Sequence, residues 1–506
     1  MRSEMERGSV VDVIANVRIA GEGRELMPLA LVEPAALYDV FLREGRILDI
    51  APAGNAVRRG AVLDAEGAWL VPGLWDHHVH LLQWALAQSR ASVEHAASPT
   101  EAAALAAAQP ASDDGRRVLQ RWRDGLWSEA ASRAALDAAT GDVPTYLLAA
   151  DSHAVWMNAA AFRREGLEPT ASGILREDDA FRMISVVNQV SDATADRAVR
   201  AAADAAAARG VVGVWDLEFG WELPAWRRRA AAGWDALRVY TDVYPDRLET
   251  AIGEGLETGA PLAGSDLIRV GMLKVLADGS LGTRTAWTTD PYDGHPHHHG
   301  GHNVAPERMV ELVVRAAAAG IATTIHAIGD RTNAAALDAF ARAGVPGRIE
   351  HAQLVAAADV QRFAHLGVSA SVQPQHALDD RELTDRYWGA HRATPYPLRS
   401  FRDAGVDILL GSDAPVAPLD PWGAMAAAVF RTDDDRAPWH PEQALDARTA
   451  LAASTAGGSG DPQTIEPGAP ADLAVVAHDP LAADREALRA MPVHATLLGG
   501  RLTHLA

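Results

Sequence analysis

Two histidines at the end of an apolar run are the strongest chemical signal in this sequence. His78 and His80 stand in the segment Asp76-His77-His78-Val79-His80, directly after the apolar residues 68–75. Because the side chains of a strand alternate between its two faces, His78 and His80 point to one side, where both can bind one metal ion, and His77 points to the other. The pair indicates a metal site, although two histidines at this spacing also occur on solvated strand ends.

Four further candidate ligands stand in or directly after later apolar runs. Lys274 lies within the run 268–276, and a buried lysine is costly unless it is paired, neutralised or chemically modified. Pairing with Asp278 is the plain structural alternative. The other three candidates end later strand candidates: His326, His351 and Asp413. Each alone is more simply explained as a structural histidine or a helix-capping aspartate, but four coincidences favour one shared site.

The composition excludes several classes of partner and site. The chain has 506 residues, 48% of them hydrophobic, and a formal net charge of -21, which repels phosphate backbones and anionic membranes. We therefore expect neither nucleic acid nor a membrane as a partner. The chain has no cysteine, so any metal must be bound by nitrogen and oxygen atoms. The mixed-charge N-terminus and the lack of an apolar run of membrane-spanning length predict a cytoplasmic protein.

Buried strand candidates alternate with alanine-rich helical stretches through the middle of the chain. We place the strands near residues 69–75, 211–217, 237–243, 268–276, 321–326, 347–351, 368–373 and 407–411. Eight such units predict an α/β fold, a (β/α)8 TIM barrel, whose catalytic groups lie at the carboxyl ends of the strands. A ninth apolar run, 146–150, lies within residues 84–200, which we interpret as an insertion that forms a wall or lid over the pocket.

Both ends of the chain show the short strands and tight turns of a β-rich structure. Neither end is large enough to fold alone, so we expect them to pair in one small β-sandwich domain. The predicted division is 1–67 for the N-terminal part of the sandwich, 68–460 for the catalytic barrel with its insertion at about 84–200, and 461–506 for the C-terminal part of the sandwich.

The motifs around these candidates resemble those of the metal-dependent amidohydrolase superfamily, and within it the YtcJ-like branch that includes N-substituted formamide deformylases. The resemblance covers nearly the whole chain and rests on residues 72–80, Lys274 with 277–282, 326–330, 350–353 and 411–415, with 151–158 similar to part of the branch's insertion. It implies that one metal is bound by His78, His80 and Asp413, that a second is bound by His326 and His351, and that carboxylated Lys274 bridges both. Position 77 departs from the pattern, because histidine stands where serine or threonine is usual.

Such a ligand set suits hydrolysis. Two divalent cations about 3.5 to 4 Å apart can share a water and lower its pKa to roughly 7. We expect the metal to be zinc. Asp413 would accept the proton of the attacking water and deliver it to the leaving amine. Reaction with CO2 would turn the Lys274 cation into a bidentate carboxylate. We therefore expect a hydrolase that cleaves an amide, formamide or carbamate-like C–N bond of a small molecule.

Other functions stay open. A mononuclear deaminase of the same superfamily would carry a glutamate shortly after the fifth-strand histidine, where this chain has Ala327-Ile328-Gly329. An ester or lactone hydrolase would use the same metals, and a non-catalytic scaffold would have lost ligands that this chain keeps.

Substrate contacts are harder to predict than metal ligands. Strand-end and insertion residues should face the metals, and the candidates are His153, Trp156, Asp278, Gln373 and Gln375. We interpret the histidine-rich loop 295–302 as a solvated loop. The substrate and the oligomeric state, with a homodimer as one option, do not follow from one sequence.

Overall fold

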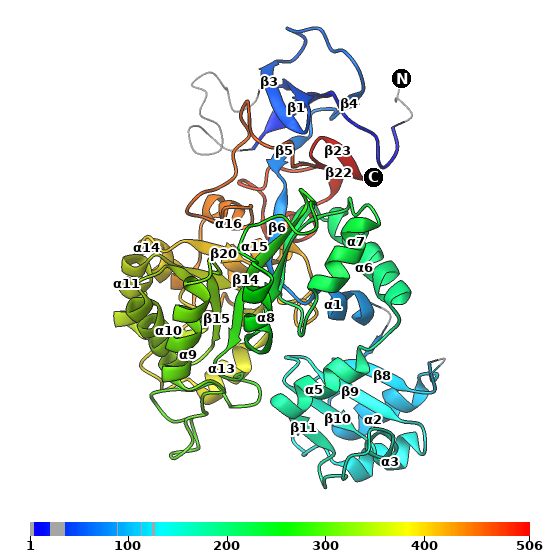
Figure 1. Cartoon of the computed structure of the whole chain (residues 1–506), viewed down its shortest axis with the longest axis vertical. Helices are drawn as coiled ribbons and strands as arrows, with labels where there is room; N and C mark the ends of the chain where they lie inside the picture. The colour runs from blue at the N-terminus through cyan, green and yellow to red at the C-terminus, as the bar shows by residue number, and fades with distance from the viewer. Residues whose placement is uncertain (1–4, 21–35, 89, 113, 124–126) are drawn as a thin grey trace.

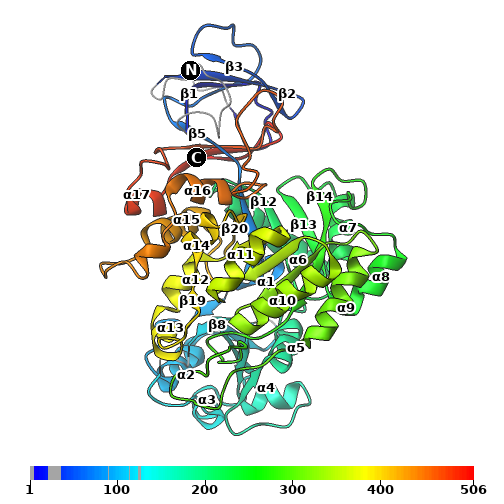
Figure 2. The same ribbon diagram turned by 90° about the vertical axis from the view of Figure 1, so that its left-hand side faces the viewer.

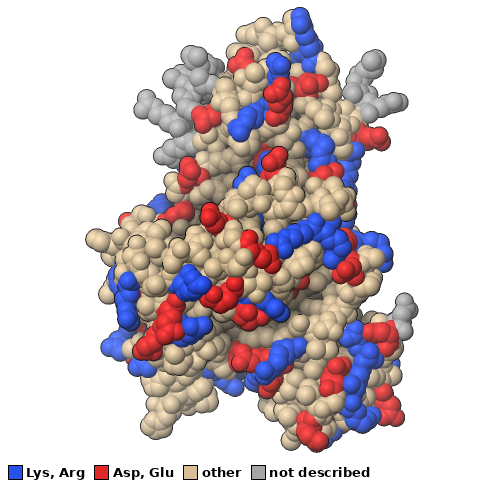
Figure 3. Space-filling model, in the orientation of Figure 1, with Lys and Arg blue, Asp and Glu red and all other residues tan. Residues whose placement is uncertain are grey.

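The computed structural model describes the chain except for residues 1–4, 21–35, 89, 113 and 124–126. Three parts are arranged along its long axis: a β-rich part that holds both chain ends, a barrel, and a smaller α/β part (Figure 1). On the face seen in Figure 3, acidic and basic side chains are interspersed. None of the helices in the described ranges is long and apolar enough to cross a membrane.

The predicted parallel barrel is confirmed. Its strands, in spatial order, are β6 (Leu74–Val79), β12 (Val211–Asp216), β13 (Arg238–Val243), β14 (Ile268–Leu276), β15 (Thr323–Ala327), β16 (Gly347–His351), β18 (Val368–Val372) and β20 (Ile408–Leu410). Every neighbouring pair along this order is parallel. The barrel strands are almost entirely buried, as the near-continuous apolar runs of a sheet covered on both faces predict.

Helices cover the outside of the barrel, as Figure 2 shows for α9 to α11. They are α1 (Leu81–Ala87), α6 (Asp192–Ala207), α7 (Leu223–Ala231), α8 (Leu248–Gly253), α9 (Pro306–Ala317), α10 (Asp330–Ala343), α11 (Ala357–Leu366), α14 (Leu398–Asp403), α15 (Pro421–Phe430) and α16 (Ala447–Ala453). Helix α9 shows why they pack there: its buried residues Met309, Leu312, Val313 and Ala316 recur at the spacing of one helix face. The short elements α12 (Pro374–Asp379), α13 (Arg381–Tyr387), β17 (Leu354–Val355) and β19 (Thr394–Pro395) follow barrel strands.

The first and last barrel strands meet at a narrow seam. Strands β6 and β20 are joined through the isolated bridge between Val79 and Ala414, beyond the end of β20. Next to it, the backbone N–H of Asp413 donates to the carbonyl of His78 over 2.7 Å. The barrel therefore closes at the segments that carry three predicted metal ligands, His78, His80 and Asp413.

A buried carboxylate strengthens this seam. Asp76 Oδ1 accepts hydrogen bonds from the backbone N–H groups of His78 and Ser412, both over 3.0 Å. Gly411 lets the strands approach, since a Cβ there would lie 2.7 Å from the backbone nitrogen of His78. Burial raises the pKa of Asp76 to about 6, while Ser412 and His78 oppose that change.

Strands from both chain ends pair with one another. The order is β23 (Arg501–Leu505), β22 (Val493–Leu498), β21 (Leu473–Val476), β5 (Trp69–Pro72), β1 (Val13–Ile19), β2 (Tyr38–Arg43) and β3 (Arg46–Pro52), with β4 (Val62–Asp64) beside β1 and the short helix α17 (Arg485–Arg489) between β21 and β22. The strand expected near 69–75 is thus divided: β5 joins this terminal sheet and β6 the barrel. Gly73 separates them, and a Cβ there would lie 2.5 Å from a Val212 methyl carbon. The division of the chain into domains stays our proposal. We change it in one respect: β5 is assigned to the sandwich domain and not to the barrel.

The long segment after α1 forms a sheet of its own. Its strands are β11 (Ile174–Arg176), β10 (Ala154–Met157), β9 (Thr145–Ala149), β8 (Arg117–Trp122) and β7 (Ala91–Ser92), and its helices are α2 (Pro99–Ala108), α3 (Arg133–Thr140), α4 (Ala159–Arg164) and α5 (Asp178–Val187). Apolar clusters around Trp156 on one face and Phe162 on the other give this insertion its own core. The ninth apolar run lies in β9, at the centre of this sheet.

Candidate metal centre

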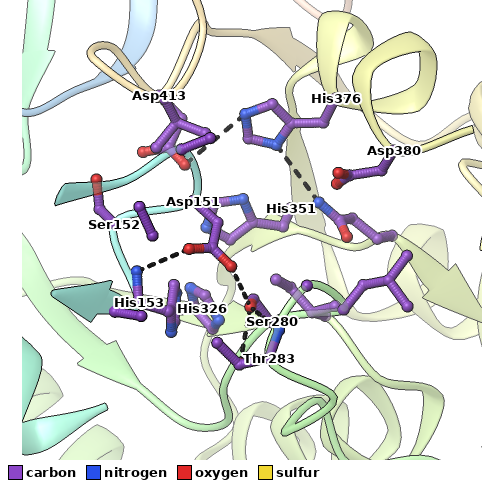
Figure 4. Close-up of a pocket in the computed structure, with 18 of the residues that line it drawn as sticks. Asp151, Ser152, His153, Ser280, Thr283, His326, His351, His376, Asp380 and Asp413 are labelled. Carbon is purple, nitrogen blue, oxygen red and sulfur yellow. Dashed lines mark hydrogen bonds and ion pairs between the residues drawn. The ribbon is translucent and has the colours of Figure 1, made fainter. Parts of the chain in front are cut away.

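All six predicted ligands line one cavity at the carboxyl ends of the barrel strands. They are His78, His80, Lys274, His326, His351 and Asp413, and none exposes more than 8% of its surface. The cavity opens to solvent, and the insertion supplies part of its wall. Figure 4 shows His326, His351 and Asp413 around the same space, with Asp151 and His153 of the insertion facing them.

Around Asp413, the site brings together donor atoms of His78, His80 and His351. The Nε2 atoms of His78 and His80 each lie 3.2 Å from Asp413 Oδ1. Ligand atoms of His78, His351 and Asp413 all lie within 4.8 Å of one another. Nitrogen and oxygen donors at these separations can surround one divalent cation.

Glu350 orients His78 from behind. Its Oε2 lies 2.7 Å from His78 Nδ1, so the imidazole donates there and turns Nε2 toward Asp413. Its Oε1 accepts hydrogen bonds from Thr324 Oγ1 (2.7 Å) and Arg348 Nε (2.5 Å). Burial would raise the pKa of Glu350, but Arg348 and His78 hold it well below its usual range. Sequence reasoning did not assign Glu350 a role, although a glutamate directly before a strand-end histidine was a usable signal.

The other part of the site holds two neutral imidazoles and an amine. The ring centroids of His326 and His351 lie 4.4 Å apart, and burial lowers the pKa of both histidines well below the usual value. Burial also lowers the pKa of Lys274 to about 8. Among the described residues, Lys274 Nζ, His80 Nδ1 and His351 Nδ1 are buried without a hydrogen-bond partner. Neutral imidazoles and unpartnered nitrogens fit the binding of divalent metal.

The backbone is strained at two of these residues. His351 has a φ of 72° and Asp413 a φ of 58°, in the left-handed region that non-glycine residues rarely adopt. Both stand where the chain leaves a barrel strand, so the turn aims the side chain into the cavity. Such strain persists only where surrounding contacts hold it.

The insertion faces the candidate ligands with a hydrogen-bonded cluster. His153 Nδ1 lies 2.9 Å from Glu177 Oε2, and Glu177 Oε1 accepts from the hydroxyls of Thr283 (2.8 Å) and Thr285 (2.7 Å). Burial opposes protonation, but Glu177 raises the pKa of His153 to about 9. Among the predicted substrate contacts, His153 lines the cavity. Its partner Glu177 was not singled out in the sequence, because nothing local links the two.

Two other predicted substrate contacts lie away from the cavity wall. Trp156 is fully buried in the insertion, with its ring 6.1 Å from that of Trp122. Gln375 donates to the carboxylates of Asp379 and Asp433, over 3.0 and 3.3 Å. Helix α12 turns Gln375 outward and His376 inward, where His376 Nε2 lies 3.9 Å from Asp413 Oδ2.

The remaining two predicted contacts support the site without lining the cavity. Asp278 is buried and accepts hydrogen bonds from the backbone N–H groups of Ile328 and Gly329, over 3.0 and 2.9 Å. It therefore holds the turn after His326. Gln373 is buried with its Nε2 3.4 Å from His78 Nδ1.

Three other histidines that stand out in the sequence lie against backbone carbonyls. His77 faces away from the cavity, with its Nε2 2.8 Å from the carbonyl of Thr455. In the histidine-rich loop, His298 Nε2 lies 2.7 Å from the carbonyl of Arg284. His299 Nδ1 lies 3.3 Å from the carbonyl of Thr288.

Comparisons with known proteins show the family and the fold of the chain. Residues 61–504 match the model described as "Amidohydrolase family". The chain is 28% identical to an N-substituted formamide deformylase of Arthrobacter pascens, over 89% of this chain and 91% of that protein. It is 25% identical to the putative amidohydrolase YtcJ of Bacillus subtilis, over 87% and 90%. An uncharacterized metal-dependent hydrolase from Pyrococcus horikoshii shares the fold, with a TM-score of 0.77, 24% identity and coverage of 94% of this chain and 99% of that one.

Proposed function

Because the chain belongs to the amidohydrolase family, we propose that it hydrolyses a C–N bond of a small molecule, in an amide, formamide or carbamate group. The observation that carries this proposal is the convergence of six nitrogen and oxygen donors on one buried cavity. The 28% identity to a formamide deformylase makes formamides the first substrates to test.

We assign His78, His80 and Asp413 to one divalent ion and His326 and His351 to a second, with Lys274 between them as a carboxylated ligand. The 3.2 Å separations around Asp413 Oδ1 support the first group. The 4.4 Å separation of the His326 and His351 rings supports the second. Zinc suits such a donor set, and when bound it would supply an activated water and polarise the substrate carbonyl.

Asp413 is our choice for the group that moves the proton. Burial would raise its pKa, but the neighbouring His78 and His80 hold the pKa well below the usual range, so the carboxylate is ionised. Its second oxygen lies 3.9 Å from His376 Nε2, on the side of the cavity. From there the proton can pass to the leaving nitrogen. His153 is the residue we propose for contact with the substrate, because it lines the cavity with its ring 5.9 Å from that of His326.

Two measurements on the purified protein test this function. Metal analysis after reconstitution with zinc and bicarbonate should give two equivalents per chain, whereas one tightly bound equivalent would favour a mononuclear deaminase. A panel of N-substituted formamides, N-acyl amino acids and aryl amides, with matched esters and lactones, should show turnover of the C–N compounds. Turnover confined to esters or lactones would overturn the bond assignment.

A further inference from the structure

Arg121 stands at an irregular point of the insertion sheet. The pairing of β8 with β9 is regular from Arg117 to Gln120, and the register shifts before Trp122. Arg121 itself has a φ of 68°, a left-handed conformation that non-glycine residues rarely adopt. A bulge of this kind bends the strand and redirects one side chain.

The redirected side chain reaches across to the barrel. Arg121 NH1 donates to the backbone carbonyls of Pro415 (3.1 Å) and Val416 (2.5 Å). Its Nε and NH2 donate to the two carboxylate oxygens of Glu94, over 2.8 and 2.7 Å. Only 16% of the arginine side chain is exposed. The guanidinium therefore joins a carboxylate of the insertion to a loop of the barrel.

That loop is the turn that carries Asp413. The backbone N–H of Val416 donates to the carbonyl of Asp413 over 2.8 Å, which closes the turn. Asp413 is in the left-handed conformation within it, so the direction of its carboxylate depends on the shape of the turn. The two carbonyls that Arg121 binds belong to the last two residues of this turn, Pro415 and Val416.

We propose that Arg121 is a positioning residue, through which the insertion holds the Asp413 turn in the shape that binds metal. The inference rests on the proposed function only in taking Asp413 as a metal ligand. Arginine suits the task because its planar fork binds a carboxylate and two carbonyls at once, whereas a lysine ammonium is a single point of charge. The insertion is then part of the metal centre as well as a wall of the cavity.

Three variants of the full-length protein test this role. Arg121→Met removes the donors and keeps the length of the side chain, and Arg121→Lys keeps one charged donor. Arg117→Met is the matched control, because Arg117 lies on the same strand and its guanidinium donates to the carbonyls of Gln109 and Thr140, within the insertion. The readouts are zinc affinity by competition with a chromophoric chelator, the visible spectrum of the cobalt-substituted protein, and amide hydrogen exchange of residues 413–418.

Arg121→Met should weaken zinc binding by about tenfold, the lower end of what loss of a supporting contact costs a metal site. Its cobalt spectrum should shift and exchange of the 413–418 amides should quicken, with Arg121→Lys intermediate and Arg117→Met like wild type. Wild-type zinc affinity, spectrum and exchange in folded Arg121→Met would overturn the proposal. Equal losses in Arg117→Met would also overturn it, because they would show a general loosening of the insertion.

Two further arms keep the test decisive. If Arg121→Met does not fold, Glu94→Gln replaces it, since that change removes one carboxylate oxygen that orients the guanidinium and should give a smaller shift in the same direction. None of the readouts needs a substrate, so they do not depend on which bond the enzyme cleaves. If wild type bound no metal, the proposed function would fail, and the exchange of 413–418 would still decide whether Arg121 holds the turn.

Discussion

Replacing Glu350 with glutamine should weaken metal binding, although Glu350 is not itself one of the predicted metal ligands. In wild type, Glu350 Oε2 accepts from His78 Nδ1 and Oε1 accepts from Arg348. Glutamine has the same shape but only one acceptor oxygen. If that oxygen stays with the Arg348 guanidinium, the amide NH2 faces His78 Nδ1, and two donors then oppose each other. The imidazole avoids this clash by moving its proton to Nε2, and in that tautomer it cannot bind metal through Nε2.

Two magnitudes follow from these contacts. Loss of a carboxylate that orients a metal-binding histidine typically lowers metal affinity by about 10-fold to 100-fold, which corresponds to about 1.4 to 2.7 kcal/mol. Arg348 is only 2% exposed, so removing its charged partner should also lower the free energy of unfolding of the metal-free protein, by about 3 to 5 kcal/mol.

Thr324→Val separates the two effects. Its hydroxyl donates to Glu350 Oε1 and does not touch His78. This variant should lose about 1 kcal/mol of stability and keep its zinc affinity within about twofold, because the His78 tautomer is unchanged. Chelator competition and denaturant unfolding of the metal-free proteins measure both quantities. The reasoning is refuted if folded Glu350→Gln binds zinc as tightly as wild type, or if Thr324→Val loses as much affinity as Glu350→Gln.

Three other predictions concern single residues. Asp413→Asn should fold and retain metal but lose roughly 10²-fold to 10⁴-fold in turnover; near wild-type turnover across the pH range on a true substrate would show that another group moves the proton. Lys274→Ala should be inactive and regain part of its activity with short carboxylic acids, and lack of rescue by acids in a protein that still binds two metals would count against carboxylation. Burial raises the pKa of Asp242 to about 7 and its Oδ2 has no hydrogen-bond partner among the described residues, so the folded chain binds a proton that the unfolded chain releases near pH 4. The contribution of Asp242 to the free energy of unfolding should therefore fall as the pH rises from about 4 to 7. Denaturant unfolding should find Asp242→Asn more stable than wild type above pH 7 and similar to it at low pH. If the difference in unfolding free energy between the two proteins were the same at pH 5 and pH 8, this assignment would be contradicted.

Much of the fold could be predicted because parallel barrel strands have a local signature. Most barrel strands are buried on both faces and are therefore short apolar runs, and all eight predicted strands correspond to observed strands. The run near 69–75 was the difficult case. Two strands that belong to different sheets follow each other there with only Gly73 between them, and hydrophobicity alone does not mark such a boundary.

Part of the candidate site could be predicted because the catalytic side chains of such barrels lie at the carboxyl ends of the strands. His78 and Asp413 follow directly from that rule, and both line the cavity. Contacts made across large sequence separations were not predictable. Glu177 meets Thr283 across 106 residues, and Arg121 meets Val416 across 295. The partners in both pairs lie in ordinary loops or strands, and only the docking of the insertion brings them together.

The seam of the barrel has a consequence for biosynthesis. Asp76 on β6 binds Ser412, which comes 336 residues later in the chain. Strand β5 pairs with β21, which comes later still. During translation His78 and His80 therefore emerge on a strand whose partner is not yet made. The donor set around Asp413 becomes complete only after β20 has left the ribosome. The complete set of candidate donors can therefore assemble only once the last barrel strand has been made, long after His78 and His80.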